Sequence, residues 1–152
     1  MFEGSVVSIH IAPAAEETMI SVSEVAAVAG KGLEGDRYFK QAGTFSKPEP
    51  DRELTLIEVE ALEGLKKESD IELNQGDPRR NIVTRGVPLN HLVGRDFTIG
   101  EVRVRGLRLC EPCAHLARLT RQEILPGLIH RGGLRAQILT AGVIRKGDII
   151  RA

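Results

Sequence analysis

The chain has 152 residues, enough for one domain with a hydrophobic core and too few for two ordinary ones. Hydrophobic residues make up 41% and charged residues 28%, which excludes a disordered or fibrous chain. No apolar run reaches the roughly 18 residues of a membrane span, and the N-terminal segment lacks the features of a signal peptide. We therefore expect a cytoplasmic protein without a membrane partner, whose two cysteines do not form a structural disulfide.

The formal net charge is zero, which argues against a nucleic-acid partner, but the charges are unevenly distributed along the chain. Residues 1–78 hold 16 acidic and 7 basic side chains, whereas residues 79–152 hold 5 acidic and 14 basic ones, of which 13 are arginine. Because a guanidinium group offers a flat fork of donors, this bias favours a site for a small anionic ligand. The alternative is that the arginines merely pair with the acidic half across the surface.

Alternating apolar and polar residues predict β structure at the N-terminus. Val7, Ile9 and Ile11 alternate with polar side chains, as in a strand with one buried face. A second strand-like stretch covers residues 20–28 and ends at residues 30–32, where two glycines permit a left-handed backbone.

A polar turn is expected at Gly35-Asp36-Arg37, and residues 41–51, which contain two prolines, are expected to form a loop. The clearest helix start follows that loop, because Thr55 and Glu58 have the spacing of a capping box. Apolar residues then recur at helical spacing, and the charged residues between them would face solvent. The apolar set is Leu56, Val59, Leu62 and Leu65, and the charged set is Glu60, Glu63, Lys66 and Lys67.

Short elements separated by glycine-containing turns are predicted for the rest of the chain. The expected strands are residues 79–85, the stretch around Val102 and Val104 with a bulge at Gly106, Ala136–Leu139 and Asp148–Arg151. Short helices are expected at Ala114–Leu119 and Glu123–His130. Many short strands and few helices favour a mainly β fold with helices (α+β), a small barrel formed as a single domain over residues 1–152.

The turn Cys110-Glu111-Pro112-Cys113 is the strongest candidate for chemistry. Pro112 suits the first position of a helix, which places Cys113 in the first helical turn. Free backbone N–H groups and the positive end of the helix dipole favour a thiolate there, although the negative charge of Glu111 opposes it. We therefore predict Cys113 as a functional thiolate.

The cysteine pair has three other interpretations. Cys110, Cys113 and His115 supply three ligands for zinc, but no further motif completes a tetrahedral site, so no zinc is expected. A thioredoxin-type redox pair needs a βαβ setting that the strand pattern lacks. The third interpretation is that both cysteines are inert and buried.

The segment Arg131-Gly132-Gly133-Leu134-Arg135 combines flexible glycines with two guanidinium groups, which suits contact with a phosphate. Arg131 and Arg135 are therefore candidate contacts to an anionic cofactor, although the segment could also be a plain turn. Neither a complete dinucleotide fingerprint nor a phosphate loop is present. His10, His91 and His130 lack ligand spacing and are left out of the site.

Several segments, taken in order, resemble the MOSC domain, the C-terminal module of molybdenum cofactor sulfurases. They are GKGLEGDRY, TLIEVEAL, RRNIVTRG, LNHLVGRDFTIG, CEPCAHL and the closing Gly147-Asp148. The resemblance covers nearly the whole chain and implies a β-barrel-like fold that holds the molybdenum cofactor (molybdopterin), an anionic pterin dithiolene, beside one cysteine.

In family members that act as reductases this cysteine binds molybdenum, and Cys113 matches its position, with Cys110 as an optional, secondary partner. Arg37 in the GDR segment, and Arg79 and Asn81 in the RRN segment, resemble cofactor contacts. Guanidinium donors suit the phosphate, an amide suits the pterin edge, and a soft thiolate suits molybdenum.

The leading hypothesis is an oxidoreductase that reduces N-hydroxylated or N-oxide compounds with Cys113 as the molybdenum ligand. No flavin or iron–sulfur domain is fused, so electrons would come from a separate redox partner. The first alternative is a sulfur carrier in which Cys113 accepts a persulfide from a cysteine desulfurase. The second is a non-catalytic cofactor-binding or regulatory domain, which the acidic Glu111 favours.

Overall fold

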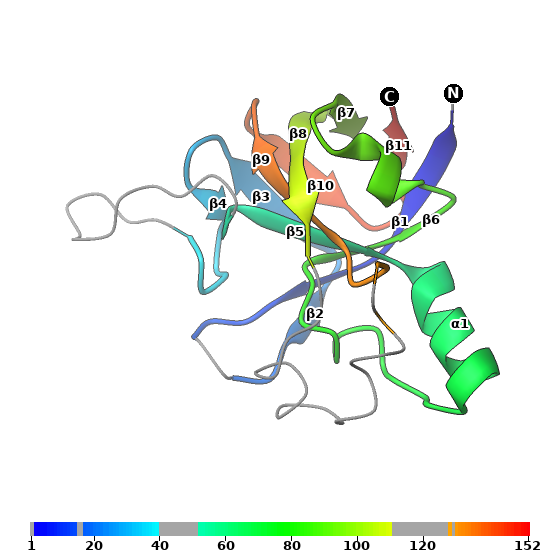
Figure 1. The fold of residues 1–152 in the computed structure, drawn as a ribbon. Helices are drawn as coiled ribbons and strands as arrows, with labels where there is room; N and C mark the ends of the chain where they lie inside the picture. Colours follow the sequence, from blue (N-terminus) through cyan, green and yellow to red (C-terminus); the bar gives the residue numbers. More distant parts are fainter. Residues whose placement is uncertain (1, 15–16, 40–51, 111–127, 129) are drawn as a thin grey trace.

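The structure is a computed structural model that describes residues 2–14, 17–39, 52–110, 128 and 130–152. Within these ranges, strands predominate and one α-helix, α1, accompanies them (Figure 1). The elements in chain order are β1 (Glu3–Ile11), β2 (Ile20–Val22), β3 (Glu24–Val28), β4 (Gly32–Leu33), β5 (Leu54–Glu58), α1 (Val59–Ser69), β6 (Ile82–Arg85), the 3-10 helix η2 (Leu89–Leu92), β7 (Asp96–Ile99), β8 (Val102–Leu109), β9 (Leu134–Ile138), β10 (Gly142–Arg145) and β11 (Ile149–Arg151).

The main sheet closes into a barrel. Its strand order is β11-β7-β8-β9-β5-β6-β1-β2, and β11 also pairs with β1, so that the first seven strands of this order form a ring and β2 extends from it. Neighbouring strands are antiparallel except β5 and β6, which run parallel. A smaller sheet, β10-β3-β4, lies beside the barrel. The expectation of a small, mainly β, barrel-like fold is confirmed.

The barrel interior is filled by apolar side chains from every strand of the ring. Alternation along β8 is typical, because Val102 and Val104 are fully buried while Arg103 and Arg105 face solvent. Ile9, Leu54, Leu56, Ile82, Leu134 and Ile150 are all completely buried in the same cluster.

Strand β1 differs from the simple alternation that Val7, Ile9 and Ile11 predict. Its pairing with β6 shifts register between Val6 and Ser8, which marks a bulge. Val6, Ile9 and Ile11 therefore enter the barrel core, whereas Val7 packs against a second apolar cluster beneath α1. The second strand-like stretch, residues 20–28, is divided between β2 and β3.

The predicted helix start at Thr55 is wrong. Residues 54–58 form strand β5, and α1 begins after Glu58, which makes no side-chain capping bond. Leu54 and Leu56 lie in the barrel core, while Ile57 belongs to the cluster under α1, so the strand is covered on both faces. A strand buried on both faces carries apolar residues on both sides. In β5 some of these residues also have the spacing of a helix, and the sequence alone does not distinguish the two cases.

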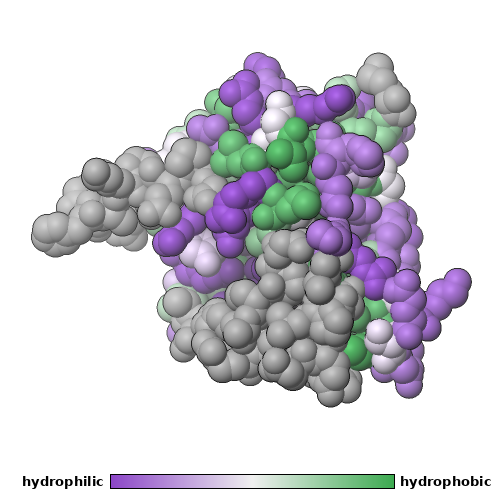
Figure 2. Space-filling view, in the orientation of Figure 1, coloured by the Kyte–Doolittle hydropathy of each residue, from purple (hydrophilic) through white to green (hydrophobic). Residues whose placement is uncertain are grey.

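The later part of the predicted helix is confirmed. Val59, Leu62 and Leu65 are buried on the inner face of α1, and the four charged residues expected on its outer face are exposed. Figure 2 shows mostly hydrophilic side chains over this edge of the molecule. No helix in the described part of the chain is long and apolar enough to cross a bilayer.

The C-terminal predictions are partly confirmed. A register shift between Gly106 and Arg108 gives β8 its expected bulge, and a side chain at position 106 would collide with the Leu92 carbonyl. Strand β6 is shorter than predicted, and β7 and β10 were not predicted. The loop at 41–51 and the helix at Ala114–Leu119 fall outside the described residues, as does Glu123–His130 except for Leu128 and His130.

Candidate functional site

A buried arginine joins the three segments that surround Cys110. Arg80, only 8% exposed, donates from Nε to the Gly132 carbonyl (2.8 Å), from Nη1 to Pro78 (3.2 Å) and from Nη2 to Cys110 (3.2 Å). The Gly132 carbonyl lies just before β9, the Pro78 carbonyl before β6 and the Cys110 carbonyl just after β8. A single guanidinium therefore holds the end of the strand from which the cysteine turn departs.

Cys110 is itself fixed at that point. Its thiol is free and the residue is 3% exposed, and its N–H donates to the Gly133 carbonyl (2.7 Å). Gly133 has φ +121°, and a side chain there would collide with the Leu56 carbonyl of β5. The glycine loop thus touches the cysteine segment through its backbone.

The GDR segment meets the RRN segment through Arg37. Its Nη2 donates to the Arg79 carbonyl (3.3 Å), and its Nη1 donates to Asp36 Oδ1 (3.1 Å). Asp36 Oδ1 also accepts from the Ala12 N–H (3.0 Å). The side chain of Arg37 is 9% exposed and that of Asp36 is fully buried, and no described residue donates a hydrogen bond to Asp36 Oδ2. A buried carboxylate oxygen without a donor is costly, so this atom is a point where a bound donor group would be stabilised.

Asn81 ties together three strands. Its Oδ1 accepts from both the N–H and the hydroxyl of Thr55 (3.1 Å each), and its Nδ2 donates to the His10 carbonyl (3.1 Å). The residue is 1% exposed. Asn81 therefore fixes the ends of β1 and β6 against β5, next to the two arginines that precede it.

Arg79 has a left-handed backbone (φ +63°), and its Nη1 donates to the Glu17 carbonyl (2.5 Å). Arg131 instead turns toward α1, where it pairs with Glu68. Arg135 lies on β9, in register with Thr55 of β5 and with Arg108 of β8.

The structure thus brings Arg37, Arg79, Asn81 and Cys110 into one continuous network, whereas Arg131 leaves it for α1. Cys113, the predicted thiolate, lies outside the described residues, and so do Glu111 and Pro112. The roles predicted for all of these residues in binding a cofactor stay predictions.

Sequence reasoning missed Arg80 and Asp36. Asp36 precedes Arg37 in the GDR segment, and Arg80 lies between Arg79 and Asn81 in the RRN segment. The motifs therefore indicated the correct segments but not these two residues. Alternation of inward and outward side chains could not separate Arg80 from Arg79, because both precede β6 and Arg79 has a left-handed backbone.

The donor set suits an anionic cofactor better than a metal ion bound by side chains alone. Within the described ranges, no three His, Cys, Asp or Glu side chains converge on one point. Guanidinium groups and a buried acceptor are present instead, which fit a phosphate and a ring that carries N–H groups. The residues present are therefore compatible with a phosphorylated pterin.

Comparisons with known proteins agree on the fold. A crystal structure of the YuaD protein from Bacillus subtilis is similar with a TM-score of 0.81 at 16% identity, covering 99% of this chain and 97% of that one. YiiM from Geobacillus stearothermophilus gives 0.71 at 19% identity, covering 97% and 74%, and YiiM from Escherichia coli gives 0.63 at 19%, covering 99% and 69%. No curated protein matches the chain significantly in sequence. The family model described as "MOSC domain" matches residues 8–151.

Proposed function

Because the chain belongs to the MOSC domain family, we propose that it binds the molybdenum cofactor, with Cys113 as the ligand to molybdenum, and reduces N-hydroxylated or N-oxide compounds in the cytoplasm. The observation that carries the proposal is the network that joins Arg37, Arg79 and Arg80 to the Cys110 carbonyl, within a family match that spans nearly the whole chain.

Each residue of the network has a distinct task in this proposal. Arg79 and Arg37 donate hydrogen bonds to the phosphate of the cofactor. The two residues lie together, because Arg37 Nη2 donates to the Arg79 carbonyl. Asp36 Oδ2, which has no hydrogen-bond partner among the described residues, accepts from an N–H group of the pterin. Arg80 fixes the strand end from which the chain continues to Cys113.

The cofactor supplies two-electron chemistry at the metal. Reduction of an N-hydroxylated amine to the amine consumes two electrons and two protons and releases water. A separate redox protein delivers the electrons, because the chain carries no sequence motif of a flavin or iron–sulfur domain. Protein residues then hold the cofactor and the substrate in place.

The first test measures molybdenum and pterin in protein made in cells that synthesise the cofactor. We expect about one molybdenum per chain in the wild type and in Cys110→Ala, and a loss of most of the metal in Cys113→Ala. Arg79→Asn, which tolerates the left-handed backbone, is expected to lower the pterin content at least several-fold. Arg103→Ala, on the exposed face of β8, is the matched control and should retain the wild-type content.

Three results would redirect the proposal. Wild-type protein without molybdenum or pterin would overturn cofactor binding. A mass increase of about 32 Da at Cys113 after incubation with a cysteine desulfurase, without bound metal, would instead indicate a sulfur carrier. Loaded protein that fails to reduce any N-hydroxylated compound with a chemical electron donor would leave a cofactor-binding domain without this activity.

A further inference from the structure

A polar cavity lies on the outer face of the barrel, beside the segments that Arg37 and Asn81 contact. It has a volume of about 270 Å³ and lies between β1, β2 and the turn at residues 74–77. Because Ile9 and Ile11 enter the barrel core, Ser8 and His10 lie on the opposite face of β1. The residues that line the cavity include His10, Met19, Ser21, Asn74, Gly76 and Asp77.

The hydrogen bonds of His10 determine which of its nitrogens carries the proton. Ser8 Oγ donates its single hydrogen to Gln75 Oε1 (2.6 Å), so it can only accept from His10 Nε2, 2.8 Å away. His10 is therefore protonated at Nε2. Burial lowers the pKa of its imidazole, although the Asp77 carboxylate opposes this shift.

With Nε2 protonated and the ring neutral, Nδ1 carries a lone pair. No group in the described part of the chain donates to it. Gly76 lies against this nitrogen, since a Cβ built on it would come within 3.0 Å of Nδ1. The absence of a side chain at position 76 therefore keeps the approach to Nδ1 open.

The charged groups around the cavity also favour a ligand that donates hydrogen bonds. Asp77 is the one formal charge among the lining residues that the structure describes, and one of its oxygens accepts from the Asn74 N–H (2.9 Å). Arg37 lies behind Met19, with Nη1 3.4 Å from the thioether sulfur, but its charge is balanced by the buried Asp36. Arg79 is also close, since its Nη1 donates to the Glu17 carbonyl next to the lining residue Thr18, so the negative charge that a ligand meets is confined to the Asp77 side of the cavity.

We propose that this cavity binds a small planar organic cation with at least two N–H groups, of the amidinium or aminoheterocycle class. One N–H donates to His10 Nδ1, and the positive charge is balanced by Asp77. The volume lies just below the range of drug-sized pockets, so it admits a ligand of about ten non-hydrogen atoms. This site is independent of the proposed cofactor function.

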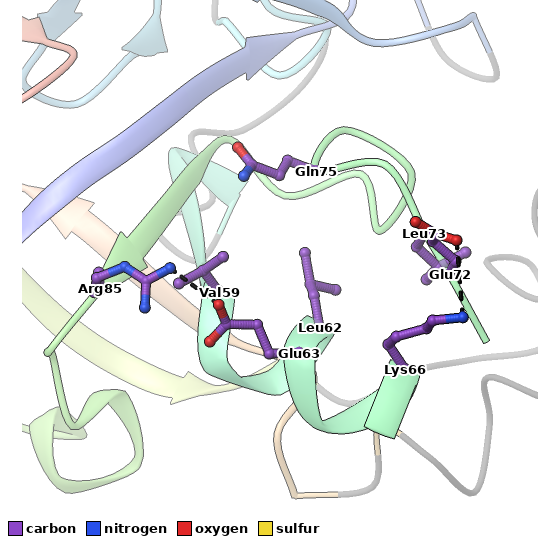
Figure 3. A pocket seen from close by; sticks show the side chains of 8 residues that line it. All are labelled: Val59, Leu62, Glu63, Lys66, Glu72, Leu73, Gln75 and Arg85. Carbon is purple, nitrogen blue, oxygen red and sulfur yellow. Dashed lines mark hydrogen bonds and ion pairs between the residues drawn. The ribbon is translucent and has the colours of Figure 1, made fainter. Parts of the chain in front are cut away.

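A neighbouring pocket of about 360 Å³ does not share these properties and provides the control. Figure 3 shows Val59 and Leu62 of α1 pointing into it, with Arg85 paired to Glu63 and Lys66 paired to Glu72 on opposite sides. The side chains of Val59 and Leu62 make its floor apolar, and its charged side chains form ion pairs with each other. Gln75 borders both pockets, so the two are adjacent but chemically different.

Benzamidinium, with nine non-hydrogen atoms, is a suitable probe, and its neutral isostere benzamide tests the need for charge. Titration calorimetry at pH 7.5 should detect benzamidinium binding and at least tenfold weaker binding of benzamide. In nitrogen NMR spectra, the Nδ1 resonance of His10 should shift on addition of benzamidinium. Acetate, an anionic probe, should not bind.

Asp77→Asn keeps an oxygen that can accept from Asn74 and removes the charge, so it should weaken benzamidinium binding about tenfold. Gly76→Ala should abolish binding, because the added methyl group obstructs Nδ1, while a thermal melt confirms that the fold is kept. Glu63→Gln in the neighbouring pocket should bind as the wild type does. The proposal is wrong if benzamidinium does not bind, if benzamide or acetate binds equally well, or if Asp77→Asn and Gly76→Ala both retain wild-type affinity.

Discussion

Replacement of Arg80 by methionine tests whether one buried guanidinium organises the barrel end. Methionine keeps the length and apolar character of the side chain but donates no hydrogen bonds. Three carbonyl groups, those of Pro78, Cys110 and Gly132, then lose a charged donor at distances of 2.8–3.2 Å. Each unsatisfied buried group costs about 1–3 kcal/mol, and partial entry of water reduces the sum. We expect the free energy of unfolding to fall by about 3–5 kcal/mol, a large part of the ~5–15 kcal/mol of a typical domain.

Unfolding in guanidinium chloride measures this loss. Circular dichroism is the suitable probe, because the chain has no tryptophan for fluorescence and a single tyrosine. The reaction rate of the Cys110 thiol, measured in a Cys113→Ser background, reports the same change locally, because Arg80 holds the Cys110 carbonyl. Arg80→Lys should be intermediate, as one ammonium group cannot reach three separate carbonyls with the geometry of the fork.

Arg103→Met is the matched control. Arg103 is an exposed arginine of β8 whose ion pair with Asp96 lies in solvent, and its replacement should leave both readouts unchanged. If Arg80→Met unfolds at the wild-type denaturant concentration and Cys110 remains equally protected, then Arg80 does not organise this end of the barrel.

Three further changes test other parts of the structure. Gly133→Ala should lower the unfolding free energy by more than about 3 kcal/mol, because it combines a φ of +121° with a collision at the Leu56 carbonyl; a wild-type melting temperature would contradict this. Burial raises the pKa of Glu53, so the folded state binds its proton more tightly and stability should fall as pH rises from 4.5 through the folded pKa; Glu53→Gln should flatten that part of the pH–stability curve, and an unchanged slope would refute the assignment. The pKa of His10 is lowered, so the unfolded chain binds more protons and stability should be lost as pH falls below 6.5; His10→Gln should remove this component in urea unfolding measured from pH 5 to pH 7.5.

The sequence predicts the barrel where local pattern and burial agree. On β8, alternation and a phase slip at Gly106 are both visible in the residues, and the structure has the strand and its bulge at that position. On β5 the local pattern does not match the burial. This strand pairs with β6 and β9 and is covered by α1, so apolar residues point to both of its faces. Some of these apolar residues have helical spacing by coincidence. Only the pairing of β5 with strands distant in sequence shows that the segment is a strand and not a helix.

The site shows the same division. The motifs GDR and RRN indicate the two segments that meet at the barrel end, since Arg37 donates to the Arg79 carbonyl 42 residues away. The task of each side chain was not predictable, because Arg80 acts on carbonyls 30 and 52 residues away. Such contacts depend on which strands are neighbours in the closed barrel, and the sequence pattern carries no information on that order.

The arginine-rich half of the chain serves two different purposes. Several of its exposed arginines pair with carboxylates of the acidic half, as in the pairs Arg85–Glu63, Arg131–Glu68, Arg145–Glu24 and Arg151–Glu3. For these residues the simple explanation of the charge bias, pairing across the surface, is sufficient, and such pairs contribute little to stability.

Arg80 is of the other kind, because it is buried and donates to three backbone carbonyls of segments distant in sequence or adjacent to it. Its hydrogen bonds to these carbonyls act in a low-dielectric region, beside Arg79 and the strand end at Cys110. An anionic cofactor at this end of the barrel would meet a strand end held rigidly by Arg80, with Arg37 and Arg79 beside it, so the position of these three arginines matters more than the number of arginines in the sequence.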